Sequence, residues 1–531
     1  MIEPVPGAGR AALREIVEGA ALVEYPGAAG DRAAAAAGAL HRALKARPVR
    51  GVLDVMPGAR TLLLLYDPAM LTLEGVARAA WGARRAAPVA RGRRAVRIPV
   101  CYGGAAGPDL PSVAAHGGLS EMEVVRRHAG GSYTVGFIGF APGFPYLRGL
   151  PAELAAPRLA SPRTRVPAGS VGIGASYTGI YPSETPGGWR LIGRAPVRLF
   201  DPQASRPALL EPGDEVAFER IDEEELVRRL AALPPPRPPP LIGRPLFRLA
   251  TPGLWTSVQG SPRYGFGSSG VPPGGAMDFA ALAEGNALLG NPPAAAGLEI
   301  TMLGPALETL SACRIVLSGG AGAAERDGTP LAAGAVHTMR EGDRIRLGRT
   351  AGGARGYLCA DGGLENTPWP MPSRRLDAGD RLHRAPNGPG ASPPALVPAP
   401  DDGAPLRVVL SAAVDRFRPE AVETLLSRPY RVSPASDRRG IRLEGDPLAH
   451  RAGAEVEPEG TALGSIQVPP DGLPIVLGPD RPVTGGYVTI GTLLPEDWPR
   501  ATRALPGSEL RFAVARVARV IAEPGGGGSG R

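Results

Sequence analysis

The stretch Gly136-Phe-Ile-Gly-Phe-Ala-Pro-Gly-Phe-Pro-Tyr-Leu147 decides the fold class of this chain. It continues through Ser161-Pro-Arg-Thr-Arg-Val-Pro-Ala-Gly-Ser-Val171 to Thr178-Gly-Ile-Tyr-Pro-Ser-Glu-Thr-Pro-Gly-Gly-Trp-Arg-Leu-Ile-Gly193. Glycine and proline recur every few residues, separated by β-branched and aromatic residues. This spacing predicts short strands and tight turns and excludes a helix of normal length. Such a stretch is either a set of turns in a β-barrel or a preformed site whose backbone approaches a ligand.

Parts of this stretch recur later in the chain in the same order. The recurring pairs are Gly169–Ile173 with Gly464–Val468, Gly187–Gly193 with Gly485–Gly491, and Gly213–Phe218 with Gly507–Phe512. A further copy of the last piece lies at Gly342–Leu347. Motifs that recur in order indicate repeated β-rich modules. The matching Gly-Gly turns indicate either a shared turn geometry or a shared kind of site.

The composition limits the chemistry. Glycine and proline number 74 and 61, but the hydrophobic content is 43%, which favours a β-rich globular protein over a disordered one. Of the 59 basic residues only Lys45 is a lysine, so 58 are arginine. A P-loop is therefore excluded, and a Schiff-base lysine would have to be Lys45. Lys45 lies in a helical pattern rather than on a hairpin tip, so we expect no covalent biotin on this chain.

The sequence offers little support for metal, nucleic acid or membrane binding. The three cysteines are isolated and the six histidines scattered, so we expect no metal site and no disulfide framework. Arginines cluster between Arg84 and Arg97, but without interleaved aromatic residues or a recognition module, which favours a solvated inter-domain segment. The charged N-terminus and the absence of a membrane-length apolar run predict a cytoplasmic protein.

At 531 residues the chain should hold about three or four domains. The order strand-helix-strand-strand-helix over residues 20–87 predicts a small α+β subdomain of ferredoxin-like type. The expected divisions are an α+β subdomain at 1–95, a β module at 96–233, a proline-rich linker at 234–245, two further β modules at 246–395 and 396–523, and a flexible tail at 524–531. Ser120 and Glu123 form a capping box for a helix that ends at His128. His128 serves either a structural role or proton transfer.

The long glycine and proline motifs resemble the B subunit of bacterial 5-oxoprolinase, a family also called kinase-A inhibitor proteins or allophanate hydrolase subunit 1. The second half resembles the C subunit, or allophanate hydrolase subunit 2. Together the halves look like the carboxyltransferase region of urea carboxylase and urea amidolyase. The resemblance implies cyclophilin-like β-barrel modules with a site at the cleft between the halves, and a chain in which two separate subunits are fused.

The resemblance implies an ATP-dependent component that activates 5-oxoproline, a small cyclic amide, for ring opening to glutamate with a separate A subunit. The cofactor would be ATP with magnesium. One alternative is a carboxyltransferase that moves carboxyl from a biotin carrier to urea or a similar amide; another is a regulatory inhibitor of a sensor histidine kinase. The expected partners are the A subunit, the small amide and further copies of this chain, with no nucleic acid and no membrane.

Site residues are carried over from the family's motifs. Two loop arginines, Arg163 and Arg165, lie between Pro162 and Pro167, where a rigid loop could grip an anion bidentately. The expected catalytic residues are Arg163, Arg165, Asp471, Asp480 and Tyr487. The expected substrate-binding residues are Tyr146, Tyr181, Gly187, Gly188, Trp189, Asp278, Asn286, Arg438, Gln467, Thr484, Gly485 and Gly486. This set of arginine, carboxylate, hydroxyl and backbone amide groups can hold an anion or a planar amide and stabilise an oxyanion.

Four positions depart from the family's pattern. Ala105 replaces a glutamate, Gly260 an aspartate, and Asp437 an asparagine. Thr489 stands where the family has a lysine after Gly-Gly-Tyr-Pro. A lysine beside a phosphate or carboxylate would be functional, so arginine must compensate for it or the activity is altered.

Overall fold

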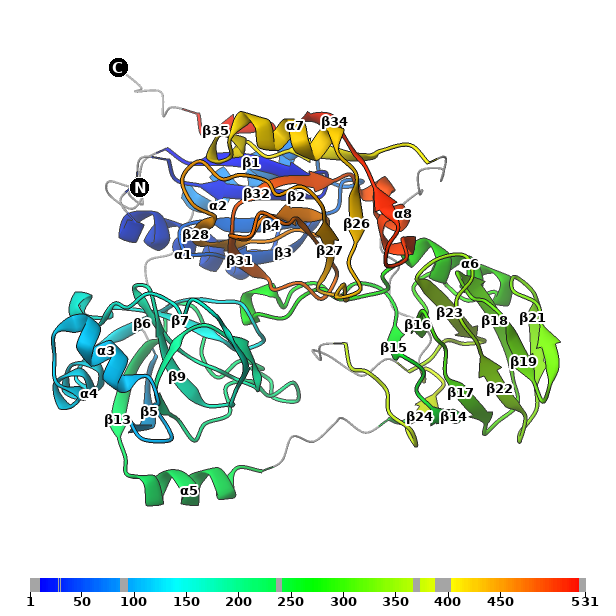
Figure 1. The fold of residues 1–531 in the computed structure, drawn as a ribbon, viewed down its shortest axis with the longest axis horizontal. Helices are drawn as coiled ribbons and strands as arrows, with labels where there is room; N and C mark the ends of the chain where they lie inside the picture. The colour runs from blue at the N-terminus through cyan, green and yellow to red at the C-terminus, as the bar shows by residue number, and fades with distance from the viewer. Residues whose placement is uncertain are drawn as a thin grey trace.

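The computed structural model describes residues 10–26, 28, 30–85, 94–234, 241–365, 373–386 and 403–524. It contains an N-terminal subdomain (10–85), a barrel (94–220), a sandwich (241–386) and a C-terminal module (403–517). In Figure 1 the N-terminal subdomain and the C-terminal module pack together, with the barrel and the sandwich below them on opposite sides. This mainly β architecture with one α+β unit confirms the predicted fold class.

The N-terminal subdomain has two helices on one face of a sheet. Its elements are β1 (Ala12–Val17), β2 (Ala20–Glu24), α1 (Gly30–Ala46), β3 (Val52–Pro57), β4 (Leu62–Tyr66) and α2 (Leu73–Arg85). The sheet order is β3-β4-β2-β1-β35, and β35 (Val520–Ala522) is the last strand of the chain. The sequence predicted β2 to α2 but neither β1 nor the return of the C-terminus to this sheet.

The other face of this sheet packs on the C-terminal module. Leu22, Met56 and Leu63 are fully buried in one cluster with Val409 and Val483. Ion pairs cross the same boundary, since Glu15, which is 2% exposed, binds Arg516 and Arg519. The first and last parts of the chain therefore form one packed body.

The barrel is closed by seven strands in the order β10-β7-β6-β13-β5-β12-β9. Its first strand, β5, pairs in parallel with its last, β13. The predicted cap is confirmed, because Ser120 Oγ accepts a hydrogen bond from Glu123 N at 3.2 Å. The elements are β5 (Ala95–Tyr102), α3 (Leu110–Gly117), α4 (Glu121–Ala129), β6 (Tyr133–Ile138), β7 (Pro145–Arg148), η1 (Ala152–Leu154), β8 (Arg163–Val166), β9 (Ser170–Gly174), β10 (Tyr177–Ile180), β11 (Thr185–Gly187), β12 (Arg190–Arg194) and β13 (Glu215–Arg220).

The C-terminal module repeats this strand order. Its sheet runs β33-β26-β27-β30-β29-β32-β25-β34, and only Arg511 separates the two end strands in sequence. The first strand β25 again pairs in parallel with the last, β34. The elements are β25 (Leu406–Leu410), α7 (Pro419–Ser427), β26 (Tyr430–Val432), β27 (Gly440–Glu444), β28 (Glu455–Gly460), β29 (Ser465–Gln467), β30 (Ile475–Leu477), β31 (Thr484–Tyr487), β32 (Thr489–Leu493), α8 (Trp498–Arg503), β33 (Glu509–Leu510) and β34 (Phe512–Val517). The repeat predicted from the recurring motifs is confirmed.

The sandwich packs two sheets around a shared core, with α6 (Phe279–Leu289) on the far face of one sheet. Its sheets run β20-β19-β22-β17-β14-β24 and β15-β16-β23-β18-β21. The third Gly-Asp motif, Gly342–Leu347, only begins a strand here and does not mark a third barrel. The strands are β14 (Pro245–Thr251), β15 (Trp255–Gln259), β16 (Gly297–Thr301), β17 (Ala306–Thr309), β18 (Cys313–Gly319), β19 (Ala324–Arg326), β20 (Thr329–Leu331), β21 (Val336–Met339), β22 (Arg344–Leu347), β23 (Arg355–Ala360) and β24 (Arg381–His383).

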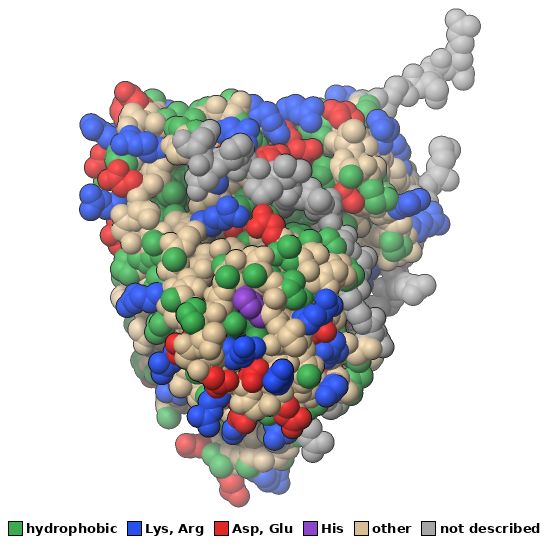
Figure 2. Space-filling view, turned by 90° about the vertical axis from the view of Figure 1, so that its right-hand side faces the viewer, with side chains coloured by type: hydrophobic (Ala, Val, Ile, Leu, Met, Phe, Trp, Pro, Cys, Tyr) green, Lys and Arg blue, Asp and Glu red, His purple; other side chains and the backbone are tan. Residues whose placement is uncertain are grey.

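The surface of the sandwich carries both signs of charge. Basic and acidic side chains lie interspersed on the face shown in Figure 2. On the six-stranded sheet they form pairs such as Arg248 with Glu308 and Arg346 with Glu325. Residues 235–240 of the predicted linker, and Arg91 and Arg93 of the arginine cluster, lie outside the described ranges.

None of the helices in the described ranges has both the length and the apolar character needed to cross a bilayer. The single lysine, Lys45, lies in the last turn of α1 and pairs with Glu211 at 3.7 Å.

Candidate active site

The aromatic residues of the motif stretch form one cluster at the end of the barrel. The Phe144 ring meets those of Tyr146, Tyr181 and Trp189 edge-on, with centroids 5.1–5.2 Å apart. Burial raises the pKa of Tyr181 to about 12 and that of Tyr146 further, and nearby Arg158 lowers both. Three of the predicted substrate-binding residues, Tyr146, Tyr181 and Trp189, are therefore packed in one cluster. The two tyrosines are neutral at pH 7.

Strand β31 of the C-terminal module lies against this end of the barrel. A Cβ placed on Gly139 would be 2.0 Å from Thr484 Oγ1, and one placed on Gly486 would be 3.8 Å from a guanidinium nitrogen of Arg158. Thr484 and Gly486 are two residues apart on a strand, so they face the barrel on the same side. Thr484 and Gly486, which were predicted from the second half of the sequence, thus meet Gly139 and Arg158 of the barrel, which were not predicted as site residues.

The other two units also reach this junction. Ala59 N donates to Pro458 O at 2.7 Å, and Gly143 N donates to Ser269 O at 2.9 Å. Asp54, on edge strand β3, accepts bonds from Phe266 N and Gly267 N, at the start of η2 (Gly267–Ser269) in the sandwich. Burial raises the pKa of this carboxyl, and the backbone donors act in the opposite direction. These contacts fix the barrel, subdomain, sandwich and C-terminal module around the junction.

Arg163 and Arg165, which were predicted to lie on a rigid loop, lie instead on strand β8, and they differ in their surroundings. Arg163 donates to Asp109 Oδ1 at 2.7 Å, and Asp109 Oδ2 accepts a bond from Leu191 N. The second terminal nitrogen of Arg163, Nη1, is buried without a hydrogen-bond partner among the described residues. Arg165 is largely exposed and pairs with Glu184 at 2.7 Å. Arg163 is therefore held rigidly with an unused donor, as an anion-binding residue would be.

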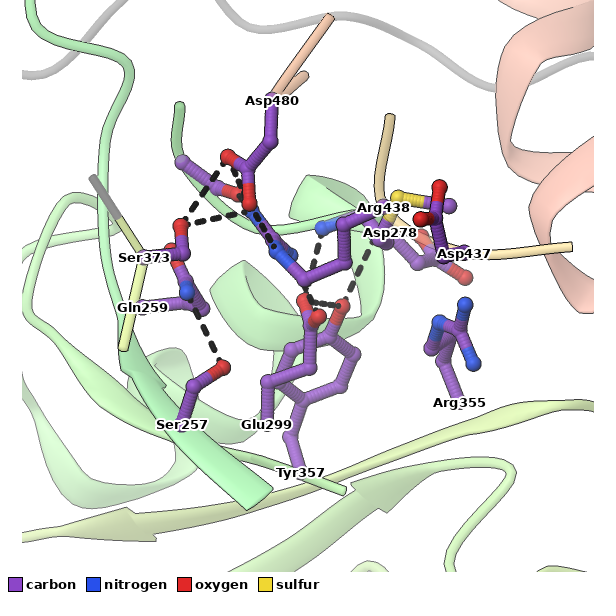
Figure 3. A network of polar contacts seen from close by, with 12 residues as sticks. Ser257, Gln259, Asp278, Glu299, Arg355, Tyr357, Ser373, Asp437, Arg438 and Asp480 are labelled. Carbon is purple, nitrogen blue, oxygen red and sulfur yellow. Dashed lines mark hydrogen bonds and ion pairs between the residues drawn. The ribbon is translucent and has the colours of Figure 1, made fainter. Parts of the chain in front are cut away.

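A second polar network joins the sandwich to the C-terminal module (Figure 3). Arg438 is 4% exposed and binds Glu299 Oε1 at 2.5 Å and Asp480 Oδ2 at 2.8 Å. It also donates to Gly275 O, while Ser373 Oγ donates to Asp480 at 2.9 Å. The two carboxylates hold the pKa of Arg438 well above its usual value against the desolvation that lowers it. The predicted residues Arg438 and Asp480 are partners in this buried network.

Other predicted residues occupy structural contacts. Asp278 caps α6 through Ala281 N and pairs with Arg503 at 2.5 Å. Asn286 Nδ2 donates to Ala295 O at 2.8 Å and so holds the loop after α6. Asp471 is exposed, 3.0 Å from Leu473 N in the turn between β29 and β30. The structure does not bring these three residues to the junction, and their predicted roles stay predictions.

The remaining predicted residues lie on or beside the Gly-Gly turns. Gln467 Nε2 donates weakly to Tyr487 O at 3.4 Å, which links β29 to β31. A Cβ on Gly485 would be 2.3 Å from the Gln467 amide, and one on Gly187 would be 2.4 Å from the Tyr181 hydroxyl oxygen. At both turns a neighbouring side chain lies so close to the backbone that only glycine, which has no Cβ, fits there. Gly188 lies between Gly187 and Trp189 on the same turn.

His128 is fully buried inside the barrel. Its Nδ1 lies 2.9 Å from the Tyr102 hydroxyl and its Nε2 2.9 Å from Thr178 Oγ1, while its ring stacks on Phe218. Burial lowers the pKa of His128 to about 3, so the imidazole is neutral at pH 7. Of the two roles left open by the sequence, these contacts favour the structural one.

Sequence reasoning missed Arg158, Asp109, Glu299 and Asp54. Asp109, Glu299 and Asp54 bind partners that lie far away in the chain, and only the fold places Arg158 beside Gly486 of the other half. Two of the four departures from the family's pattern have clear surroundings. Thr489 begins β32 opposite Gln467, and a Cβ placed on Gly260 would be 3.2 Å from the Ala296 methyl group. An aspartate at 260 would need space that Ala296 occupies.

The described residues contain no group of three histidine, cysteine or acidic residues placed to hold a metal ion. A pocket of about 480 Å³ lies away from the junction, and Gly353, Arg500, Arg503 and Arg511 contribute to its lining. No predicted site residue lines it.

Comparison with known proteins agrees with this geometry. A family model described as carboxyltransferase domain, subdomain C and D, matches residues 11–210, and one described as carboxyltransferase domain, subdomain A and B, matches residues 269–514. The fold and both halves therefore define a carboxyltransferase-type domain pair. The crystal structure of TTHA0988 superposes with a TM-score of 0.80 at 34% identity, over 93% of this chain and 99% of that one.

Named relatives match each half separately. The 5-oxoprolinase B subunit of Escherichia coli O157:H7 is 49% identical over 32% of this chain and 77% of the relative. The 5-oxoprolinase C subunit of Escherichia coli K12 is 29% identical over 52% of this chain and 93% of the relative. The urea amidolyase of Lachancea kluyveri is 28% identical over 52% of this chain but only 17% of the relative. The chain belongs to the family of the 5-oxoprolinase B and C subunits and joins both halves in one polypeptide.

Proposed function

We propose that this chain is the fused B–C component of an ATP-dependent 5-oxoprolinase that opens 5-oxoproline to glutamate together with a separate A subunit. The observation that carries the proposal is the junction, where Gly139 and Arg158 of the B-like half lie against Thr484 and Gly486 of the C-like half. The relatives named as the B and C subunits of 5-oxoprolinase match these two halves.

The chemistry requires activation of a poor electrophile. An amide carbonyl resists attack by water, and transfer of a phosphoryl group from ATP to its oxygen makes the carbon reactive. One water then attacks that carbon and the ring nitrogen leaves, which gives an acyl phosphate; a second water cleaves it to glutamate and phosphate, and ADP is the product of the first transfer. ATP supplies the phosphoryl group, and this chain would hold the amide.

Donors at the junction suit that role. Arg163 Nη1 and Thr484 Oγ1 are buried and have no hydrogen-bond partner among the described residues. Such preorganised donors can stabilise negative charge on an activated amide, because they need no rearrangement when the charge develops. The aromatic rings of Tyr146 and Trp189 would exclude water from the apolar edge of a small ring.

The test is glutamate formation and ADP release by the purified chain mixed with the A subunit, ATP and 5-oxoproline. Arg163→Ala should lower turnover by about 10²-fold or more, the scale of one lost preorganised donor. Arg206→Gln, an exposed change elsewhere on the barrel, is the control, and thermal unfolding shows whether loss of the Asp109 pair affects folding. Ring opening without ATP, or an Arg163→Ala protein as fast as the parent, contradicts the proposal. Urea-dependent turnover with carboxybiotin would support the carboxyltransferase alternative.

A further inference from the structure

Arg158 is a half-buried arginine at the junction that the family motifs did not indicate. Burial raises the pKa of the Tyr146 and Tyr181 phenols, and the positive charge of the Arg158 guanidinium lowers the pKa of both. It also lies beside Gly486 of the C-like half, at 3.8 Å and 4.0 Å from the place of a Cβ on that glycine. Arg158 is thus a cation between the aromatic cluster and the opposing half.

The backbone on both sides of Arg158 is fixed. Ala156 bridges to Ala175, whose N–H donates to Ala156 O at 2.9 Å. Pro157 O accepts a bond from Arg190 Nε, and Leu159 N donates to Gly188 O at 2.7 Å. The guanidinium is therefore presented from a rigid support, which lowers the entropy cost of binding a ligand.

Arg158 has no carboxylate partner in the described part of the chain, nor any hydrogen bond from its side chain. The other junction arginines do have partners: Arg163 pairs with Asp109, Arg60 with Glu457, and Arg148 donates to Ala59 O. A half-buried guanidinium without a carboxylate partner keeps its donors available for an anionic ligand. The structure leaves that place open.

Gly486 keeps space beside the guanidinium. Its φ is not in the left-handed region, so the backbone does not demand glycine there. A larger side chain would instead fill the volume next to Arg158. The neighbouring Thr484, on the same side of β31, is 3% exposed and its hydroxyl has no partner among the described residues. The Arg158 guanidinium and the Thr484 hydroxyl therefore lie on the same side of β31, with the hydroxyl packed against Gly139.

We propose that Arg158 binds the carboxylate of the substrate and so selects a carboxylate-bearing amide over a neutral one such as urea. This inference rests on the proposed function, since 5-oxoproline carries a carboxylate on its ring carbon next to the nitrogen. The planar guanidinium matches a carboxylate with two parallel hydrogen bonds. Arg158 would then be a specificity-determining residue, with the reacting amide held further along the junction.

Kinetics with the A subunit and ATP test the inference. Arg158→Gln should raise KM for 5-oxoproline by about 10- to 100-fold, the worth of a hydrogen-bonded charge pair, with kcat little changed. Arg158→Lys keeps the charge but loses the bidentate geometry, so its KM should lie between that of the parent and that of Arg158→Gln. For 5-oxoprolinamide, in which a carboxamide replaces the carboxylate, parent and Arg158→Gln should have equal KM. Arg206→Gln should match the parent on both compounds.

An Arg158→Gln protein with the parent KM for 5-oxoproline, or with an equal loss for both compounds, overturns the inference and leaves the proposed function standing. If the parent forms no glutamate, the proposed function fails, and calorimetry on the chain alone decides the inference. Binding of 5-oxoproline but not its amide, abolished by Arg158→Gln, supports it. Equal binding of the two compounds, or no binding of either, overturns it.

Discussion

Two loops at equivalent places in the repeated strand order reach the same segment of the sandwich by different means. The barrel loop between β6 and β7 contacts residues 260–278 through backbone, with Gly143 N donating to Ser269 O. Its counterpart between β26 and β27 contacts this segment through the buried side chain of Arg438, which binds Gly275 O and Glu299. The repeated fold therefore fixes where a loop lies, whereas its residues decide whether it forms an apolar, aromatic-lined end or an ion-pair network.

The most severe test is to cut the chain within residues 235–240 and co-express the pieces. The Leu22, Met56 and Leu63 cluster and the Glu15 ion pairs cross between the halves, so we expect them to copurify. A dissociation constant below about 1 μM corresponds to about 8 kcal/mol or more. Pieces that elute separately at micromolar concentration would contradict the prediction that the two halves form one packed unit.

Arg438→Met should lower the free energy of unfolding by about 3–5 kcal/mol, because Glu299 and Asp480 are left buried without their partner. Adding Glu299→Gln should recover part of this loss. The exposed neighbour Arg439→Met is the control and should stay within about 0.5 kcal/mol. Urea denaturation measures all three, and an Arg438→Met protein as stable as the control would mean that the network is not needed for folding.

The apolar loop is tested by adding one methyl group. Gly139→Ala should cost about 1–3 kcal/mol, because its Cβ would overlap the Thr484 hydroxyl. Gly486→Ala, whose Cβ makes ordinary contacts at 3.5 Å and beyond, should change stability by less than about 0.5 kcal/mol. Equal thermal shifts for the two variants would contradict the close approach of Gly139 to β31.

A smaller, pH-dependent effect separates the barrel from its repeat, which has no counterpart of buried His128. The folded-state pKa of His128 is lowered to about 3, so the unfolded chain binds the extra proton between pH 3 and 6.5. The stabilising contribution is therefore nearly complete above about pH 7 and is lost, by up to about 1.4 kcal/mol per pH unit, as the pH falls from 6.5 towards 3. Unfolding of parent and His128→Gln between pH 5 and 7 should differ by this slope, and parallel curves would contradict it.

The repeat and most helices could be predicted because their signals are local. Glycine and proline spacing marks the turns of β9 to β12, and Ser120 with Glu123 marks the start of α4. Strand β1 was missed because Arg14 and Glu15 look like surface residues. Both are buried, since Glu24, Glu459, Arg516 and Arg519 pair with them from distant positions.

The same contrast between local and long-range signals applies to the candidate site. Tyr146, Tyr181 and Trp189 belong to one continuous motif, and the structure brings them into contact. Asp278 and Asn286 also belong to a recognisable motif, but their side chains hold α6 and its loop. A motif records that a residue matters without saying whether it touches ligand or backbone. Arg158 was not indicated by any of the motifs. Only the fold shows that it lies beside Gly486.

Strand β35 has a consequence for the order in which the protein can be completed during synthesis. Strand β1 at the edge of the N-terminal sheet pairs with residues 520–522, which are synthesised long after β1 itself. Until then β1 presents an unpaired edge open to other strands. Where the two halves are made as separate chains, the same strand would have to pass from one polypeptide to the other. In the fused chain, β1 and β35 belong to one molecule, so their pairing does not depend on the association of two polypeptides.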